Sequence, residues 1–284
     1  MTQPADPVVS CTWLAERLGA PDIRVIDATW FLPGDARNAR TLYQERRIPG
    51  AVFFDIDDIA DHDTDLPHML PRPEAFASRM RKLGIGDGVR IVVYDNHGIF
   101  SAARVWWTFR VMGHDDVTVL DGGFPAWERG GYPIEDGAPR PLKERHFTAR
   151  MRTDLVRDLS DMRRVVAGGK TPVLDARPAP RFHGEAAEPR PGLRSGHMPG
   201  AKSIPSGVLV DENGMLRSRE DLARIFRDAG ADTNQPAVCS CGSGITAAII
   251  ALALARLGRW DAAVYDGSWA EWGAREDTAV VTGG

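Results

Sequence analysis

The sequence has few cysteines, no long apolar run and little excess charge of either sign. Three cysteines in 284 residues are an odd and small number, which makes a framework of disulfides improbable. The longest apolar run, residues 247–255, is far shorter than the roughly 20 residues that a helix needs to cross a bilayer. The first ten residues contain no basic segment followed by an apolar one, so we expect no secretory signal and a cytoplasmic protein.

The charges nearly cancel. Thirty-five Lys and Arg against 39 Asp and Glu leave a formal net charge of −4, which provides no long-range attraction to nucleic acid or to an anionic membrane. Hydrophobic residues at 43% and charged residues at 26% are ordinary values for a globular chain. The composition therefore predicts a soluble, folded protein with neither of those two partners.

The chain repeats itself at a distance of about half its length. Val-Ile-Asp-Ala at residues 25–28 reappears as Val-Leu-Asp-Ala at residues 173–176, and Ile-Pro-Gly-Ala at 48–51 reappears as Met-Pro-Gly-Ala at 198–201. Solenoid repeats run to roughly 20 to 50 residues, so a repeat of this length indicates a duplicated domain. We predict a first domain over residues 1–136, a linker over 137–152 and a second domain over 153–284.

Short β-branched runs alternate with helical segments in each copy, which predicts an α/β fold with mainly parallel sheets flanked by helices. The predicted strands include residues 25–27, 90–94, 117–120 and 237–240, and the predicted helices include residues 73–83, 102–112 and 246–257. The last of these helices is apolar on nearly every face, so we expect it to be buried.

A glycine-rich loop, Cys-Gly-Ser-Gly-Ile-Thr at residues 241–246, follows the strand 237–240 and precedes the buried helix. Active sites of parallel sheets lie at the carboxyl ends of their strands. The glycines let the backbone curl so that its N–H groups, together with those of the helix N-terminus, form an anion nest. A cysteine at the mouth of such a nest is expected to ionise readily and act as a nucleophile. The alternative is a buried, inert thiol, the usual fate of a free cysteine.

Two other chemistries use similar loops. Gly242 to Ala247 fits the dinucleotide fingerprint G-x-G-x-x-A, but the 37 residues that follow are too few for the remaining strands of a nucleotide-binding half. A cysteine phosphatase needs an arginine six positions after the cysteine to hold the phosphate, and Ala247 stands there. Both hypotheses are therefore weak.

No metal site or cofactor is expected. The pair Cys239 and Cys241 lacks the C-x-x-C spacing and has no accompanying H-x-x-x-H. The acidic run at residues 61–65 begins like an EF-hand, but Leu66 stands in place of the required glycine and Arg72 in place of the closing glutamate. This run is more simply a solvated loop.

The motifs taken together resemble the tandem rhodanese-like domains of the 3-mercaptopyruvate sulfurtransferases, over nearly the whole chain. The residues that carry the resemblance are the loop 241–246, Tyr-Asp-Gly-Ser-Trp at 265–269 and Glu-Trp-Gly at 271–273, with Ile-Pro-Gly-Ala at 48–51, Phe-Asp-Ile-Asp at 54–57, Pro-His-Met-Leu-Pro at 67–71, Ser-Ala at 101–102 and Arg-Val-Trp-Trp at 104–107. The resemblance implies that Cys241 takes sulfur from a small donor, becomes a persulfide and passes the sulfur to an acceptor. The implied acceptors are cyanide and thiols, including the thiol of a thioredoxin-like protein. The first domain lacks the cysteine and is expected to be catalytically silent.

The resemblance also implies the substrate-binding residues. Arg181 and Arg190 match the clamps that hold the carboxylate and keto oxygen of a planar α-keto acid, a geometry that suits guanidinium groups. The loop residues Gly242, Gly244, Ile245 and Thr246 complete the predicted substrate site. Thiosulfate enzymes of the same architecture typically carry basic side chains directly after the cysteine, whereas this chain has Gly242 and Ser243. This difference favours 3-mercaptopyruvate over thiosulfate.

A proton relay of Ser243, His68 and Asp57 is likewise implied by the resemblance. A histidine oriented by an aspartate and touching a serine hydroxyl is the arrangement that general-base catalysis needs. Three hypotheses stay open: a 3-mercaptopyruvate sulfurtransferase, a thiosulfate sulfurtransferase of the same fold, and a non-catalytic rhodanese-like binding module. The third predicts a missing cysteine, and Cys241 is present. The remaining cysteines, Cys11 at a helix start and Cys239 in a strand, are expected to be structural, as are Trp106, Trp107 and Trp272.

Overall fold

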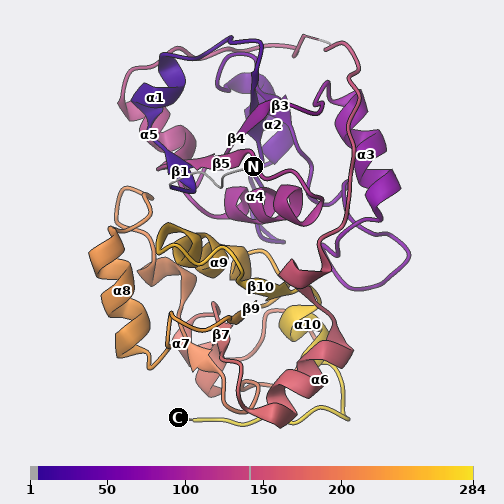
Figure 1. Cartoon of the computed structure of the whole chain (residues 1–284), viewed down its shortest axis with the longest axis vertical. Coiled ribbons are helices and arrows are strands. Elements are labelled where there is room, and N and C mark those ends of the chain that lie inside the picture. The colour runs from indigo at the N-terminus through magenta and orange to yellow at the C-terminus, as the bar shows by residue number, and fades with distance from the viewer. Residues whose placement is uncertain (1–5, 141, 284) are drawn as a thin grey trace. The chain divides into compact units, whose positions relative to one another are not determined.

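The computed structural model describes residues 6–140 and 142–283 and divides the chain into two compact units (Figure 1). Unit 1 contains the residues up to Asp61 together with residues 70–152 and 212–216. Unit 2 contains residues 62–69, 153–211 and those from Arg217 onward. Each unit therefore includes one short segment from the other half of the chain.

Over the described residues, unit 1 is built on a five-stranded parallel sheet in the order β1-β5-β4-β2-β3. Its central strand β4 is apolar after its first residue, and residues 91–94 are fully buried. A strand of this kind is typical of a parallel sheet that is covered on both faces. The strands are β1 (Val8–Val9), β2 (Ile23–Asp27), β3 (Val52–Phe53), β4 (Arg90–Tyr94) and β5 (Val117–Leu120).

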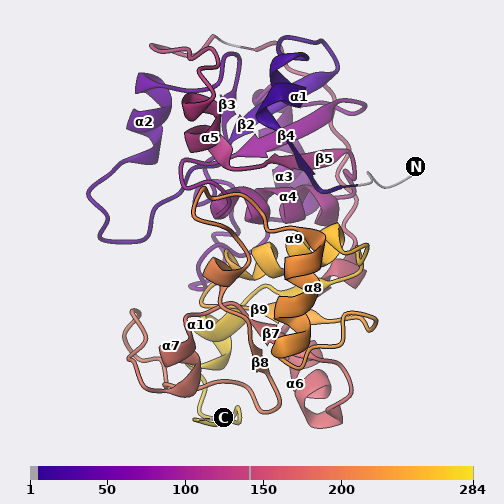
Figure 2. The ribbon, with the colours of Figure 1, turned by 90° about the vertical axis from the view of Figure 1, so that its left-hand side faces the viewer.

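Helices cover both faces of this sheet (Figures 1 and 2). On one face, Leu14, Tyr43 and Trp127 from three different helices pack with strand residues such as Val92 in a single apolar cluster. On the other face, Phe76 and Phe109 from the remaining two helices meet edge to face, with ring centroids 5.3 Å apart. The helices are α1 (Cys11–Ala15), α2 (Ala39–Glu45), α3 (Pro73–Lys82), α4 (Ser101–Val111) and α5 (Gly123–Arg129).

Unit 2 repeats this architecture within the described residues, as the internal sequence repeat predicts. Its five parallel strands have the equivalent order β6-β10-β9-β7-β8. They are β6 (Val156–Arg157), β7 (Val173–Asp175), β8 (Lys202–Ser203), β9 (Val238–Ser240) and β10 (Ala263–Tyr265). The prediction of mainly parallel sheets in two repeated domains is confirmed.

The helices of unit 2 also lie on both faces of its sheet. Met162 and Trp269, from the first and last α-helices of the unit, pack in one cluster with Val173 and Val238 of the strands. The apolar α9 has every residue from Ala247 to Ala255 buried and contacts β7, β9 and β10, so the prediction of a buried helix is confirmed. The helices are α6 (Leu159–Gly168), α7 (Ala179–His183), α8 (Arg219–Asp228), α9 (Ala247–Arg256) and α10 (Ser268–Trp272), with short 3-10 helices at Thr153–Leu155 and Ser206–Val208.

The segment predicted as a linker, residues 137–152, is placed in unit 1. Phe147 is 2% exposed and packs edge to face against Phe76, with centroids 5.7 Å apart. The backbone N–H of Asp87 donates to the carbonyl of His146 over 2.9 Å. These contacts hold residues 146–147 of the basic segment against unit 1.

The predicted helices and strands that the structure describes begin and end within two residues of their observed bounds. Ser10 caps α1, because its hydroxyl oxygen accepts the backbone N–H of Trp13 over 3.1 Å. Trp106, Trp107 and Trp272 are buried, as predicted for core residues. Among the described residues, none of the helices is both long and apolar enough to span a membrane.

Candidate active site

Three neighbouring strands of unit 2 bring polar residues to the carboxyl edge of the sheet. Cys241 directly follows the central strand β9, Asp175 ends β7 on one side, and Asp266 follows β10 on the other. The Cys241 residue is 2% exposed. The site therefore lies where parallel α/β sheets carry their chemistry.

Hydrogen bonds fix the loop around the thiol. Gly244 donates its backbone N–H to Sγ of Cys241 over 3.1 Å. The N–H of Cys241 donates to Oγ of Ser268 over 3.2 Å, and this hydroxyl donates in turn to the carbonyl of Tyr265 over 2.8 Å. Trp269 donates its N–H to the carbonyl of Cys241 over 2.9 Å. The N-terminal end of α10 thus holds the cysteine backbone from a second side.

Arg181 and Arg190 both lie beside this loop, and their role as clamps for a substrate stays a prediction. A β-carbon built on Gly242 would stand 3.2 Å from Nη2 of Arg181 and 4.0 Å from Nη1 of Arg190. Two guanidinium groups therefore lie close to the residue that follows Cys241. Nε of Arg181 is buried and has no hydrogen-bond partner among the described residues. A buried donor of this kind is costly unless a ligand supplies its acceptor.

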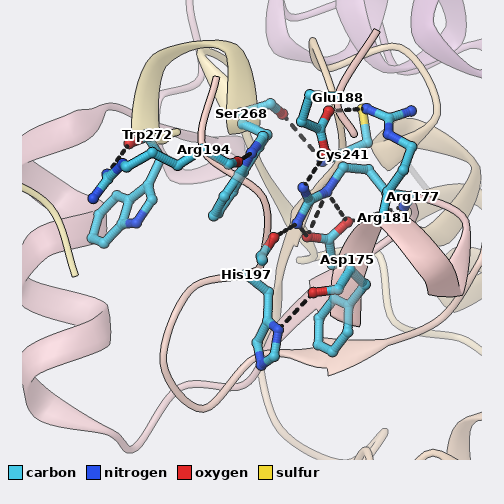
Figure 3. A network of polar contacts seen from close by, with 12 residues as sticks. Asp175, Arg177, Arg181, Glu188, Arg194, His197, Cys241, Ser268 and Trp272 are labelled. Carbon is cyan, nitrogen blue, oxygen red and sulfur yellow. Dashed lines mark hydrogen bonds and ion pairs between the residues drawn. The ribbon is translucent and has the colours of Figure 1, made fainter. Parts of the chain in front are cut away.

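A network of ion pairs leads from the sheet to Arg181 (Figure 3). Arg177 donates hydrogen bonds to Asp175 from Nε and from Nη2, the latter over 2.7 Å. Its Nη1 donates to Glu188 over 2.8 Å. The second carboxylate oxygen of Glu188 accepts from Nη2 of Arg181. Burial disfavours the charge on Arg177, but Asp175 and Glu188 outweigh it, and the pKa of Arg177 is raised.

The aromatic ring of Trp269 completes the support of this network. The guanidinium carbon of Arg177 lies 4.1 Å from the centre of the Trp269 ring. The side chains of Arg177 and Asp175 are each 1% exposed, and that of Glu188 is fully buried. Arg181, at 21% exposure, is therefore the point at which the buried network reaches solvent.

The other predicted site residues have separate positions. Ser243, Ile245 and Thr246 lie in the loop that follows Cys241, with Ser243 buried at 7% exposure. Asp57 lies in unit 1, where its Oδ2 accepts from Nε1 of Trp30 over 2.9 Å. His68 lies in the segment 62–69 of unit 2 and has a left-handed backbone φ of 61°. The relay of Ser243, His68 and Asp57 stays a prediction.

Four residues of the site were not picked out from the sequence: Asp175, Arg177, Glu188 and Ser268. Asp175 belongs to the Val-Leu-Asp-Ala repeat and ends a strand at the active edge, which is a signal that favours a site residue. Ser268 has a left-handed φ of 48°, which is uncommon for a residue with a side chain. Glu188 lies in a stretch rich in Pro and Arg, where its pairing depends on how the loop folds.

Unit 1 contains a matching loop after β4, and Asp95 takes the place of the cysteine. The carbonyl of Asp95 accepts the N–H of Phe124 over 2.9 Å, as that of Cys241 accepts from Trp269. The Asp95 carboxylate accepts the backbone N–H groups of His97, Phe100 and Ala102, each over 2.8 Å. In this unit the nest therefore surrounds a carboxylate of the protein itself.

The remaining cysteines lie in environments that disfavour the thiolate. Burial, and then the nearby Asp121, raise the pKa of Cys11 to about 11. Cys239 is fully buried in β9, and burial raises its pKa far above the usual range. All three cysteines are free thiols. Within residues 6–140 and 142–283, no group of three or more His, Cys, Asp or Glu side chains is placed to hold a metal ion.

Two similar parallel α/β units, with a cysteine at the carboxyl end of the central strand in the second, define a tandem rhodanese-like architecture. Comparison with protein families agrees, because residues 10–129 and 157–275 match the family described as Rhodanese-like domain.

Known relatives indicate which group of rhodanese-like proteins the chain belongs to. The chain is 45% identical over 273 residues to the 3-mercaptopyruvate sulfurtransferase of Escherichia coli K12, covering 96% of both proteins. It is 41% identical over 296 residues to the thiosulfate/3-mercaptopyruvate sulfurtransferase 1, mitochondrial, of Arabidopsis thaliana, covering 97% of this chain and 78% of the relative. The crystal structure of SseA from Escherichia coli, a 3-mercaptopyruvate sulfotransferase, superposes with a TM-score of 0.85 at 42% identity over 94% of this chain and 100% of SseA. The chain belongs to the 3-mercaptopyruvate sulfurtransferase family of tandem rhodanese-like enzymes.

Proposed function

We propose that the protein transfers a sulfur atom from 3-mercaptopyruvate to a thiol or to cyanide through a persulfide on Cys241, releasing pyruvate. The observation that carries the proposal is the pair Arg181 and Arg190 beside Gly242, next to the nucleophile. The buried, unsatisfied Nε of Arg181 provides a donor for an oxygen of an α-keto acid. The substrate named for the E. coli relative has the carboxylate and keto oxygen that such a fork binds.

The chemistry is covalent catalysis in two steps. The Cys241 thiolate attacks the sulfur of 3-mercaptopyruvate, an S–S bond forms, and the C–S bond breaks. The electron pair of the broken bond stays with the organic fragment as the enolate of pyruvate, which takes up a proton. An acceptor thiolate then attacks the outer sulfur of the persulfide and releases Cys241 as a thiolate. The acceptor leaves as a persulfide, or as thiocyanate when cyanide is the acceptor.

The two arginines act most strongly while the C–S bond breaks. Negative charge then develops on the keto oxygen of the enolate, and a guanidinium group already in position stabilises this charge without rearrangement. The network behind Arg181 provides that preorganisation, because Glu188 is buried and is itself held by Arg177. Gly242, Gly244, Ile245 and Thr246 shape the wall of the substrate site around the thiol.

Ser243, His68 and Asp57 supply the proton transfers in this proposal. His68, oriented by Asp57 and acting through the Ser243 hydroxyl, removes the thiol proton of the donor and returns a proton to the enolate. General acid-base assistance of this kind contributes about 10²- to 10⁴-fold to a rate.

Unit 1 is catalytically silent in this proposal. The position equivalent to Cys241 is Asp95, whose carboxylate already accepts three backbone N–H groups of its own loop. These donors are therefore not available to bind a substrate or to stabilise negative charge on one.

The proposal extends to the acceptor of the sulfur atom. A small thiol, cyanide or the exposed thiol of a thioredoxin-like protein each provides the nucleophile that the second step requires. No cofactor takes part, because the persulfide carries the sulfur between the two steps. Since the reaction needs a reduced Cys241 and a supply of thiol, we infer a reducing compartment such as the cytoplasm.

Thiosulfate is the second candidate donor, because the Arabidopsis relative bears both donor names. The test is a direct comparison of pyruvate release from 3-mercaptopyruvate with thiocyanate formation from thiosulfate and cyanide. We expect kcat/KM for 3-mercaptopyruvate to exceed that for thiosulfate by at least about 10-fold, which corresponds to about 1.4 kcal/mol. A clear preference for thiosulfate would make the protein a thiosulfate enzyme instead.

A further inference from the structure

In the ion-pair network beside the Cys241 loop, the arginines outnumber the carboxylates with which they pair. Three guanidinium groups, those of Arg177, Arg181 and Arg190, meet two carboxylates, those of Asp175 and Glu188. Asp175 pairs with Arg177, and Glu188 pairs with both Arg177 and Arg181. No ion pair to Arg190 is formed within the described part of unit 2. These five side chains therefore present one net positive charge beside Gly242.

Glu188 is the residue that determines this net charge. Its side chain is fully buried, and each of its two oxygens holds one arginine. Arg177 needs no second carboxylate to be anchored, because Asp175, the carbonyl of Gly196 and the Trp269 ring already hold it. The distinctive effect of Glu188 is to neutralise the guanidinium group of Arg181 while leaving the buried Nε of that group available.

We propose that Glu188 determines donor specificity by charge, cancelling one of the two substrate-facing arginines so that the site suits a monoanion and discriminates against a dianion. The inference rests on the proposed function. Two uncompensated guanidinium groups would favour a second negative charge on the donor, because attraction grows with the product of the charges. A single net charge provides a carboxylate with a partner and leaves the second charge of thiosulfate unpaired in a partly desolvated site.

The test uses the full-length protein and two substitutions of Glu188. Glu188→Gln removes the charge and keeps nearly the same size and an oxygen acceptor. We expect the ratio of kcat/KM for thiosulfate to that for 3-mercaptopyruvate to rise by about 10-fold or more, in line with one unit charge at close range. Thiosulfate turnover by this variant should also fall more steeply with added NaCl than that of the wild-type protein.

Glu188→Asp separates charge from position. It keeps the carboxylate but withdraws it by one methylene from Arg181, so we expect both donors to lose kcat/KM while their ratio stays within about 3-fold of the wild-type value. Glu185→Gln is the matched control. It removes the same charge from an exposed residue of the same segment, and it should leave both the ratio and the individual values unchanged.

The outcomes distinguish the inference from the function on which it rests. If wild-type protein prefers 3-mercaptopyruvate and Glu188→Gln lowers both donors in proportion, Glu188 is a positioning residue and the charge proposal is wrong. If the wild-type protein prefers thiosulfate, the proposed function fails instead. Should Glu188→Gln not fold, inhibition of the wild-type protein decides. The monoanion pyruvate should compete with 3-mercaptopyruvate at least about 10-fold more tightly than thiosulfate does at low ionic strength, and equal or tighter competition by thiosulfate overturns the proposal.

Discussion

The backbone N–H of Gly244 lies 3.1 Å from Sγ of Cys241 and donates to it from a left-handed conformation with a φ of 81°. Glycine adopts this conformation without strain, whereas residues with a β-carbon pay about 1–2 kcal/mol. The second glycine of the loop thus has a defined task, which is to turn one N–H group toward the sulfur. In the proposed mechanism, a donor in this position stabilises the negative charge on the Cys241 sulfur before it attacks the substrate and after the acceptor removes the outer sulfur.

Gly244→Ala should therefore impair sulfur transfer more than it impairs folding. The β-carbon strains the backbone at the residue that donates to Sγ, so we expect the single-turnover rate of Cys241 persulfide formation to fall by about 10-fold or more. Gly258→Ala is the control, because Gly258 has a similar φ of 91° and no atoms within 4 Å of an added β-carbon. Equal losses of activity in the two variants would show that the Gly244 contact has no special role.

Cys241 should be the residue that carries the sulfur. Incubation with donor and no acceptor should raise the intact mass by one sulfur atom, and addition of a thiol should remove it. Cys241→Ser should abolish both the adduct and turnover, while Cys239→Ser and Cys11→Ser keep both, since the environments of those two thiols disfavour ionisation. An adduct that survives in Cys241→Ser would contradict the central step of the mechanism.

The sequence predicts the part of the site that is continuous along the chain. Strand, loop and buried helix around Cys241 follow one another within 20 residues, and local hydrophobicity and glycine content are sufficient to predict them. The repeat of Val-Ile-Asp-Ala predicts the two parallel sheets for a similar reason, because each copy carries the same local pattern.

Contacts between distant segments are harder to predict. Arg181 reaches Gly242 from a point about 60 residues earlier, and only the resemblance to known enzymes indicated this proximity. Glu188 lies in an irregular stretch whose periodicity predicts nothing, so its two ion pairs become visible only in the folded loop. The loop of unit 1 clearly lacks a cysteine, but its composition does not reveal that Asp95 accepts three of its N–H groups.

The proton relay is tested by comparing the two half-reactions. His68→Ala should lower the rate of pyruvate release by about 10²-fold or more, because the donor loses its general base. Persulfide loaded by another route should still pass to an acceptor thiol at nearly the wild-type rate, since that step has its own thiolate nucleophile.

Single-turnover measurements of each half-reaction give the answer. A substitution that only disturbed folding would slow both half-reactions together. Near wild-type rates in both would leave Cys241 and its backbone donors as the catalytic groups, without His68.

Asp27, at the end of β2 in unit 1, should make stability depend on pH in an unusual direction. It is fully buried, and burial, only partly offset by hydrogen bonds from Thr29, raises its pKa from 3.8 to about 6. Between these two values the folded protein binds more protons at this site than the unfolded chain, so the contribution of Asp27 to stability falls as the pH rises. Asp27→Asn does not titrate and keeps an oxygen to accept the Thr29 N–H. Its free energy of unfolding relative to wild type should therefore shift in favour of the variant by on the order of 2 kcal/mol between about pH 4 and pH 7. Urea denaturation at several pH values measures this difference. Asp228→Asn, a substitution of an exposed aspartate, is the control. A difference in unfolding free energy that is constant with pH, or that grows toward acid, would show that Asp27 is charged at no cost in the folded protein.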